Sequence, residues 1–419
     1  MKRIIVVALL LPLAAVAQRV DTTTTDPDKY VPELGYFQKA HTDASDPRFM
    51  ITDNEGRFSM GVGGVVHCNT FYDVGGSMDG YLFSPGTIQI PVDNTSHFGY
   101  TATGSNVYVK ARAIKGNNKV TAYLSLQGSE MDGADYVMLS KAYISLNGLT
   151  IGKTYSYFMD LEAGPMTVDL EGPNTQISKV HSLIGYTQPM GRWTLAAALE
   201  APNTISTSWQ SNGVSSDYNK YPDLAARLKY RGEKGHIQAG LLLREVSYWA
   251  SKTGFGVAAD GITKYVTGYG FSLSGNYNPT GKLSFSAQGI WGNDVSHYIQ
   301  DLAPLELGLG MESVPDAEGY PTLAALTAYG GYLSASYKWS EVLRSAVVYG
   351  FCQLDDNGLM ASNPFRRSEY VAANLFVFFS PYCFFGIEYL YGHKLINAAG
   401  GADNSGYANR INASIAYRF

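Results

Sequence analysis

Basic side chains recur at alternate positions of segments whose other positions are apolar. In the segment 106–115, Lys110 and Arg112 alternate with Val109 and Ala111. If each such segment is a strand with two faces, its Lys and Arg share the polar face. That set is Lys110, Arg112, Lys141, Lys179, Arg227, Lys229, Arg244, Arg344 and Arg410. Fixed positive charges beside water attract anions, so the predicted chemistry is electrostatic selection of solutes. Alternatively, these cations neutralise nearby carboxylates.

Acidic residues gather in a different kind of segment, 159–176. Its four carboxylates, those of Asp160, Glu162, Asp169 and Glu171, are interspersed with apolar residues. Such a segment suits a loop that packs one edge on a wall and shows the other to water. Folded inward, it would constrict an enclosed lumen and place acids opposite Lys110, Arg112 and Lys179. The alternative is an external loop that caps the structure.

Catalytic and metal-binding patterns are missing from the sequence. The seven histidines show no HExxH spacing and no pairing with cysteine, and neither a GxSxG elbow nor a P-loop occurs. Three scattered cysteines, Cys68, Cys352 and Cys383, do not make a disulfide framework. We therefore predict a protein that is not an enzyme and needs no cofactor or metal.

The elements that must position these charges are strands of about ten residues with alternating apolar and polar positions. Seven tight turns are expected at 115–118, 147–148, 188–191, 232–235, 278–281, 339–340 and 381. Eight longer connections are expected near 75–105, 131–136, 159–176, 203–221, 249–264, 295–325, 355–366 and 394–408. An even number of strands with alternating short and long connections is typical of an outer-membrane barrel. We predict an all-β, transmembrane antiparallel β-barrel of about sixteen strands, with short periplasmic turns and long extracellular loops.

The segment 410–419 shows the alternation most clearly. Ile411, Ile415 and Tyr417 lie on one face, and the chain ends in Phe419. A terminal aromatic residue after such a strand is typical of the sorting signal of barrels. We predict that Tyr417 and Phe419 form an assembly signal for the barrel-assembly machinery.

Composition agrees with a barrel. Charged residues are 16% of the 419 residues and the mean hydropathy is −0.09, whereas an average soluble domain has roughly 25% charged residues. After the first 17 residues, no apolar run approaches the roughly 20 residues of a membrane-spanning helix. The aromatic content of 13% and net charge of −5 exclude a disordered chain. A mildly acidic exported protein is not expected to bind nucleic acid.

The N-terminus predicts export. Lys2 and Arg3 precede an apolar stretch, and Ala15 and Ala17 form a small-residue cleavage site. We predict a signal peptide at 1–17, a flexible N-terminal periplasmic segment at 18–56, and a barrel domain at 57–419 with an inward-folding loop near 159–176.

A thirty-residue motif adds a family resemblance. The stretch 142–160, AYISLNGLTIGKTYSYFMD, followed by VDLEGPN at 168–174, resembles the DcaP-like outer-membrane porins. That resemblance implies a homotrimer of sixteen-stranded barrels, each a channel for small solutes, with dicarboxylates as the best-known cargo.

These patterns favour a channel in the outer membrane of a Gram-negative-type bacterium. It would be surrounded by outer-membrane lipid and would pass small anionic or polar solutes by passive diffusion. Two alternatives are a barrel whose long loops bind an extracellular partner and a barrel hydrolase. Ion conductance separates the channel from both.

Overall fold

A computed structural model of the chain describes residues 20–21, 49–76, 78, 80–93, 95–131, 134–202, 213–252, 261–360, 363–397 and 403–419. The predicted signal peptide lies outside these residues, as does most of the predicted N-terminal segment. Within the described residues, no helix has the length and apolar character needed to cross a bilayer.

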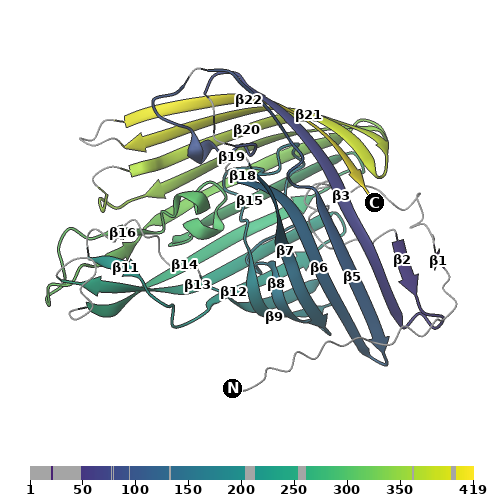
Figure 1. Cartoon of the computed structure of the whole chain (residues 1–419), viewed down its shortest axis with the longest axis horizontal. Coiled ribbons are helices and arrows are strands. Elements are labelled where there is room, and N and C mark those ends of the chain that lie inside the picture. Colours follow the sequence, from purple (N-terminus) through teal and green to yellow (C-terminus); the bar gives the residue numbers. More distant parts are fainter. Residues whose placement is uncertain are drawn as a thin grey trace.

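Sixteen antiparallel strands form one closed barrel (Figure 1). The pairing of β22 with β3 closes it, running from Arg410 opposite Asp73 to Arg418 opposite Val65. The predicted fold class is therefore confirmed. The sixteen strands are β3 (Phe58–Asp73), β5 (Asn106–Lys115), β6 (Asn118–Met131), β7 (Ala134–Leu146), β8 (Leu149–Tyr155), β9 (Val180–Met190), β10 (Trp193–Glu200), β12 (Asp223–Arg231), β13 (Gly235–Ser251), β14 (Gly261–Tyr277), β15 (Leu283–Asn293), β18 (Thr327–Lys338), β19 (Leu343–Asp355), β20 (Asn363–Ser380), β21 (Cys383–Asn397) and β22 (Asp403–Arg418).

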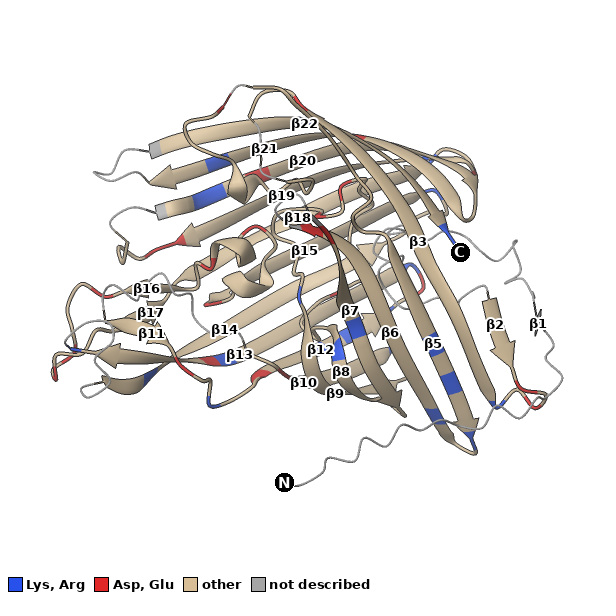
Figure 2. Cartoon of the chain, in the orientation of Figure 1, with Lys and Arg blue, Asp and Glu red and all other residues tan. Residues whose placement is uncertain are grey.

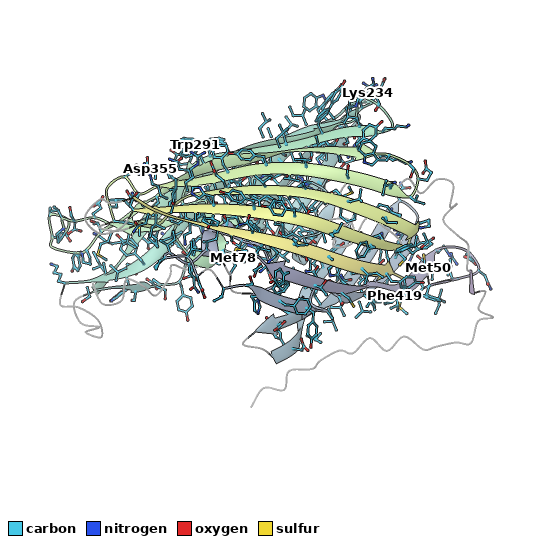
Figure 3. The ribbon with its side chains drawn as sticks, turned by 90° about the horizontal axis from the view of Figure 1, so that it is seen from above. Met50, Met78, Lys234, Trp291, Asp355 and Phe419 are labelled. Atoms are coloured by element: carbon cyan, nitrogen blue, oxygen red, sulfur yellow. The ribbon has the colours of Figure 1, made fainter. Side chains whose placement is uncertain are left out.

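Seven short turns join strands at one end of the barrel, at the predicted places. The turn between β7 and β8 has two residues, Asn147 and Gly148, with φ of 49° and 95°, the left-handed pair typical of a two-residue type I′ hairpin. In Figure 3, Lys234 of one such turn lies toward the same end as Met50 and Phe419, whereas Trp291 and Asp355 lie toward the other. We call the first the short-turn end.

Connections at the opposite end differ widely in length. The longest are 74–105, which contains η1 (Pro85–Thr87) and β4 (His97–Thr101), and 294–326, which contains η4 (Ser296–Tyr298), η5 (Ala303–Leu305), β16 (Leu309–Met311) and β17 (Leu323–Ala325). The connection 201–222 contains β11 (Val214–Ser216). The prediction of a longer connection near 131–136 is wrong. Because β6 and β7 keep pairing as far as Met131 and Ala134, only two residues join them.

Side chains alternate between the two faces of the wall. In β22, Arg410, Asn412 and Ser414 are buried inside the barrel, whereas Ile411 and Ile415 are exposed outside. Charged residues are accordingly sparse along the strands (Figure 2). This is the arrangement of a barrel whose outer surface faces lipid.

Three connections place apolar side chains inside the barrel. Phe158 packs with Val295 and Tyr298 in one cluster, and Val168 packs with Phe376 in a second. A third cluster contains Phe83 together with wall residues of β20 and β21. We call residues 156–179 the interior loop, 74–96 the first segment and 294–308 the helical segment. These three segments fill part of the barrel interior, so the open lumen is narrower than the barrel itself.

Two short strands complete the seam. β2 (Phe49–Thr52) pairs with Ser59 to Val62 of β3, beyond the point where β22 ends. β1 (Val20–Asp21) pairs in turn with β2. The edge of β3 is thus covered by β22 along one part and by β2 along another.

Candidate functional site: the interior loop and its cavities

The interior loop begins under Glu200, which lies at the end of β10. The carboxylate of Glu200 accepts hydrogen bonds from the Ser156 hydroxyl at 2.8 Å and the Tyr157 backbone N–H at 2.7 Å. It also contacts Nε2 of His181 at 2.7 Å. Sequence reasoning did not single out Glu200, although its alternation with Ala196 and Ala198 placed it on the inner face.

The first half of the loop is held by the wall of β12, β13 and β14. The Asp160 carboxylate accepts a hydrogen bond from Lys229 at 3.0 Å and one from the Ser274 hydroxyl at 2.8 Å, and lies 2.7 Å from Nε2 of His236. Burial alone would raise the pKa of Asp160, but the contact with His236 and the charge of Lys229 hold it well below its usual value. Asp160 is therefore a charged anchor.

Glu162 lies beside this anchor and nearer to water. It contacts Lys229 at 3.0 Å and Arg231 at 2.7 Å. Against the effect of partial burial, these two cations lower the pKa of Glu162. Arg227 donates a hydrogen bond to the Met159 carbonyl at 3.3 Å. The basic residues of β12 thus bind the loop that crosses in front of them.

The second half of the loop reaches the opposite wall, on β20 and β21. There the Glu388 carboxylate accepts the Val168 and Asp169 backbone N–H groups at 3.1 and 2.7 Å, and the Asn374 side chain at 2.8 Å. Asn174 of the loop donates to the Ser368 hydroxyl at 2.7 Å. The loop therefore crosses the barrel interior from one wall to the other.

Asp169 and Glu171 occupy surroundings unlike those of Asp160. Asp169 accepts backbone N–H groups of Phe83 and Gly172 at 3.3 and 3.1 Å, yet burial raises its pKa to about 6. Burial, followed by the nearby charges of Asp169 and Asp301, raises the pKa of Glu171 to about 8. Because no Lys or Arg compensates for burial as strongly as at Asp160, protons are held here near neutral pH.

A cavity of about 240 Å³, the eyelet cavity, separates this half of the loop from the wall of β6 to β9. Asp169 and Glu171 are the charged residues among its described lining. It is lined by Tyr81, Leu82, Gln127, Ser140, Tyr155, Met159, Leu161, Thr167, Asp169, Leu170, Glu171, Gly172, Gln176, Ser178, Val180 and Gln300.

Arg410 and Arg244 hold the other two interior segments. Arg410 pairs with Asp73 through two bonds, at 2.6 and 2.9 Å, and donates to the Tyr81 carbonyl of the first segment at 2.9 Å. Arg244 lies 3.4 Å from carboxylate oxygens of both Asp223 and Asp294. Both guanidinium groups lie inside the barrel, but packed segments cover them. Their contacts with Asp73, Asp223 and Asp294 match the alternative prediction, in which the basic residues neutralise nearby carboxylates.

The remaining predicted cations lie on other parts of the inner wall. Lys110 and Arg112 share the inner face of β5 with Tyr108, whose ring stacks on Tyr123 at 5.4 Å between centroids. Lys141 donates a hydrogen bond to the Tyr155 hydroxyl at 3.2 Å. Tyr155 lines the eyelet cavity, so Lys141 lies next to it. Lys179 is not among the lining residues, and the nearby charges that act on it are those of Arg244 and Asp223. Burial and the charge of Arg244 lower the pKa of Lys179.

Arg344 lies on the inner face of β19 near the short-turn end, with its guanidinium 4.9 Å from the centroid of the Phe378 ring. It lines a second cavity described below. The two residues of the predicted assembly signal lie at the seam. Tyr417 points outward, and Phe419 exchanges two 3.1 Å backbone hydrogen bonds with Gly64.

Asp301 was not foreseen from the sequence. Its carboxylate accepts hydrogen bonds from the Ser84 hydroxyl at 2.8 Å, the Gly86 backbone N–H at 2.9 Å and the Ser368 hydroxyl at 2.6 Å. It therefore joins the helical segment to the first segment and to β20. Asp301 belongs to a connection, so strand alternation could not reveal it. Among the described residues, no group of His, Cys, Asp or Glu side chains is arranged to hold a metal ion.

A closed barrel with lipid-facing strands and an interior crossed by its own loop is the architecture of an outer-membrane channel. The chain belongs to the porin subfamily, whose family model matches residues 87–345. This family and fold assign it to channels of the outer membrane rather than to enzymes, and they support the resemblance drawn from the sequence.

Solved structures show the same fold. The outer-membrane channel DcaP of Acinetobacter baumannii is 18% identical with a TM-score of 0.70, over 88% of this chain and 99% of that one. An anion-selective porin from Comamonas acidovorans is 11% identical with a TM-score of 0.56, over 86% and 100%. OmpT of Vibrio cholerae in its trimer form is 10% identical with a TM-score of 0.50, over 86% and 99%. A search of curated protein sequences found no match.

Proposed function

We propose that this porin is a water-filled channel for passive diffusion of small hydrophilic solutes and that it prefers anions, including dicarboxylates. The observation that carries this proposal is the interior loop, which crosses the barrel from β12 to β21 and leaves the eyelet cavity beside β6 to β9. A solute moves down its own gradient through that space, and the charges along it bias which solutes enter.

The sign of the preference follows from which charges are present at neutral pH. Burial raises the pKa of Glu171 to about 8, so this carboxyl group is mainly protonated at pH 7, and only Asp169, with a pKa of about 6, keeps a negative charge in the described lining of the cavity. Lys141 lies beside the cavity, Lys179 lies in the interior loop near Arg244, and Lys110 and Arg112 lie on the inner face of β5. The similar fold of an anion-selective porin agrees with this proposal.

The proposed assembly is a homotrimer in the outer membrane. One similar barrel has a trimeric form. Lys153 also shares the outer face of β8 with the exposed Ile151, and its ammonium donates to the Leu139 carbonyl at 2.7 Å. A lysine on a lipid-facing surface costs up to about 2–4 kcal/mol, so a neighbouring protomer is a better partner for this face than lipid. Export through cleavage of residues 1–17 and insertion by the barrel-assembly machinery complete the proposal.

Planar-bilayer recordings test the function. Purified, folded protein should give ohmic single-channel steps, and its reversal potential in a KCl gradient should favour chloride. The double variant K110Q/R112Q should weaken that preference. Lys115, the exposed last residue of β5, provides the control variant K115Q. No conductance would overturn the channel, and a reversal potential that favours potassium would overturn the anion preference alone.

A further inference from the structure

A second cavity, of about 420 Å³, lies between the interior loop and the short-turn end of β12 to β19. We call it the vestibule cavity. Its volume falls within the roughly 300–1,000 Å³ of ligand pockets. Four cations and two carboxylates are among its lining residues: Arg231, Lys282, Lys338, Arg344, Glu162 and Glu233. The cavity wall therefore has an excess of positive charge.

One side of this cavity is a square of four hydroxyl groups. Ser284 lies opposite Ser336, and Ser286 lies opposite Ser334, in the register of β15 and β18. All four line the cavity. The Ser336 hydroxyl already donates to the Ser284 carbonyl at 3.3 Å and keeps its capacity to accept. A hydroxyl can both donate and accept a hydrogen bond, so the square suits a molecule that carries several hydroxyl groups of its own.

Two like charges border this square. Lys338 lies directly opposite Arg344 in the register of β18 and β19, and like charges in such a pair destabilise a sheet. Glu341 contacts Lys338 at 2.7 Å, but its side chain is 85% exposed, and such an exposed pair compensates weakly. Arg344 is buried and also lines the cavity. Lys338 and Arg344 therefore place two positive charges at one corner of the cavity.

The loop side of the cavity is different in character. Gly164, Pro165 and Met166 contribute a largely apolar surface to the lining. Glu162 at its rim is already paired with Arg231 at 2.7 Å. The cavity therefore combines a cationic corner, a hydroxyl surface and an apolar face.

We propose that the vestibule cavity binds a sugar acid, with its carboxylate at Arg344 and Lys338, its hydroxyl groups on the four serines, and its C–H surface on Pro165 and Met166. Arginine recognises a carboxylate through two parallel hydrogen bonds. The proposed site rests on the proposed channel function and specifies the class of anion that binds in the channel during passage.

Isothermal titration calorimetry of the folded protein in detergent tests binding without requiring conductance. The probes are D-gluconate, which has both a carboxylate and hydroxyl groups, D-glucose, which lacks the carboxylate, and succinate, which lacks the hydroxyl groups. Gluconate should bind most tightly. Equal binding of glucose, or of succinate, would overturn the proposal.

Variants locate the site. R344Q should weaken gluconate binding about tenfold or more, since a charged hydrogen bond is lost, and R344K should restore part of it. The double variant S286A/S334A keeps the charge and should weaken gluconate while leaving succinate unchanged, so it tests the site even if R344Q does not fold. K115Q is the matched control, which should bind as the unaltered protein does. If K115Q and R344Q weakened gluconate binding equally, gluconate would not bind in the vestibule cavity.

Bilayer recordings then separate the two proposals. Gluconate added at the short-turn side should interrupt the current more often than gluconate added at the other side. A conducting channel that does not bind gluconate overturns the sugar-acid site alone. Gluconate binding to a protein that never conducts overturns the channel function alone.

Discussion

The two halves of the interior loop contain the same kind of residue in opposite surroundings. Asp160 is buried against Lys229 and His236, which hold its pKa low. Glu171 is buried near Asp169 and Asp301, and its pKa rises to about 8. Burial acts in the same direction on both, so the neighbouring charges decide the result. One half of the loop is an anchor with a fixed charge, and the other is a channel wall whose charge depends on pH.

Removing the anchor should have the largest effect. D160A leaves Lys229, His236 and Ser274 without the carboxylate that joins them, and breaking a buried ion pair costs about 3–5 kcal/mol. We expect the free energy of unfolding, measured in urea, to fall by about that amount. The exposed Asp355 provides the control D355A, with an expected change within about 0.5 kcal/mol. Similar losses in both variants would contradict the anchoring role.

Releasing the other half of the loop should cost less. E388A removes the acceptor of the Val168 and Asp169 backbone N–H groups, and an unsatisfied buried donor costs about 1–3 kcal/mol. We also expect faster proteolytic cleavage within 166–172 and noisier single-channel current. If E388A instead speeded proteolytic cleavage in the half of the loop that contains Asp160, the two halves would not be independent.

A change of pH should alter the acidic half without unfolding it. Asp169 and Glu171 are protonated below pH about 6 and ionised above pH about 8, so negative charge appears in the eyelet cavity as pH rises. A unit charge at 4 Å contributes about 1 kcal/mol in water, or about fivefold in relative permeability. The reversal potential should therefore shift toward cations between pH 5.5 and 9.

The variant E171Q should lose the upper part of that shift. Tyr81, Asp169, Asp301 and Gln300 interact with Glu171, and the charge of Asp169 raises the pKa of Glu171 more than that of Asp301 does. D169N should therefore lower the pH at which the remaining transition occurs. If the reversal potential of E171Q changed with pH as it does in the unaltered protein, the group that titrates would not be Glu171.

The smallest effect is expected at Glu162. Its side chain is 38% exposed in its pairs with Lys229 and Arg231, and exposed ion pairs contribute about 0–1 kcal/mol. E162Q should thus lower the free energy of unfolding by less than D160A does, and added salt should reduce the difference further. A loss as large as that of D160A would show that the anchor extends to the loop surface.

The sequence predicts the strands better than the contacts between them and the loop. Alternation along each strand is local, so it places Lys229 and Arg410 on the inner face and Ile415 on the outer face. Their partners are remote: Asp160 lies 69 residues from Lys229, and Val168 lies 220 residues from Glu388. Such pairs depend on closure of the whole barrel, and no local pattern reports them.

The same limitation explains the basic residues. Face alternation identifies cations inside the barrel, but it does not distinguish Lys141 beside the eyelet cavity from Arg410 beneath the first segment. The distinguishing signal is an inward acid at the same height, such as Asp73 opposite Arg410. Strand register must be known before that pairing can be found.

The seam between β3 and β22 makes closure of the barrel depend on the two ends of the barrel sequence. β3 is the first barrel strand and β22 the last, so Asp73 and Arg410, which pair across the seam, lie 337 residues apart. In lipid the backbone N–H and C=O groups of a strand edge cannot remain unsatisfied, and an open edge invites pairing with other chains. A chain without β22 would therefore leave an open edge on β3, so insertion into lipid depends on the last strand to pair.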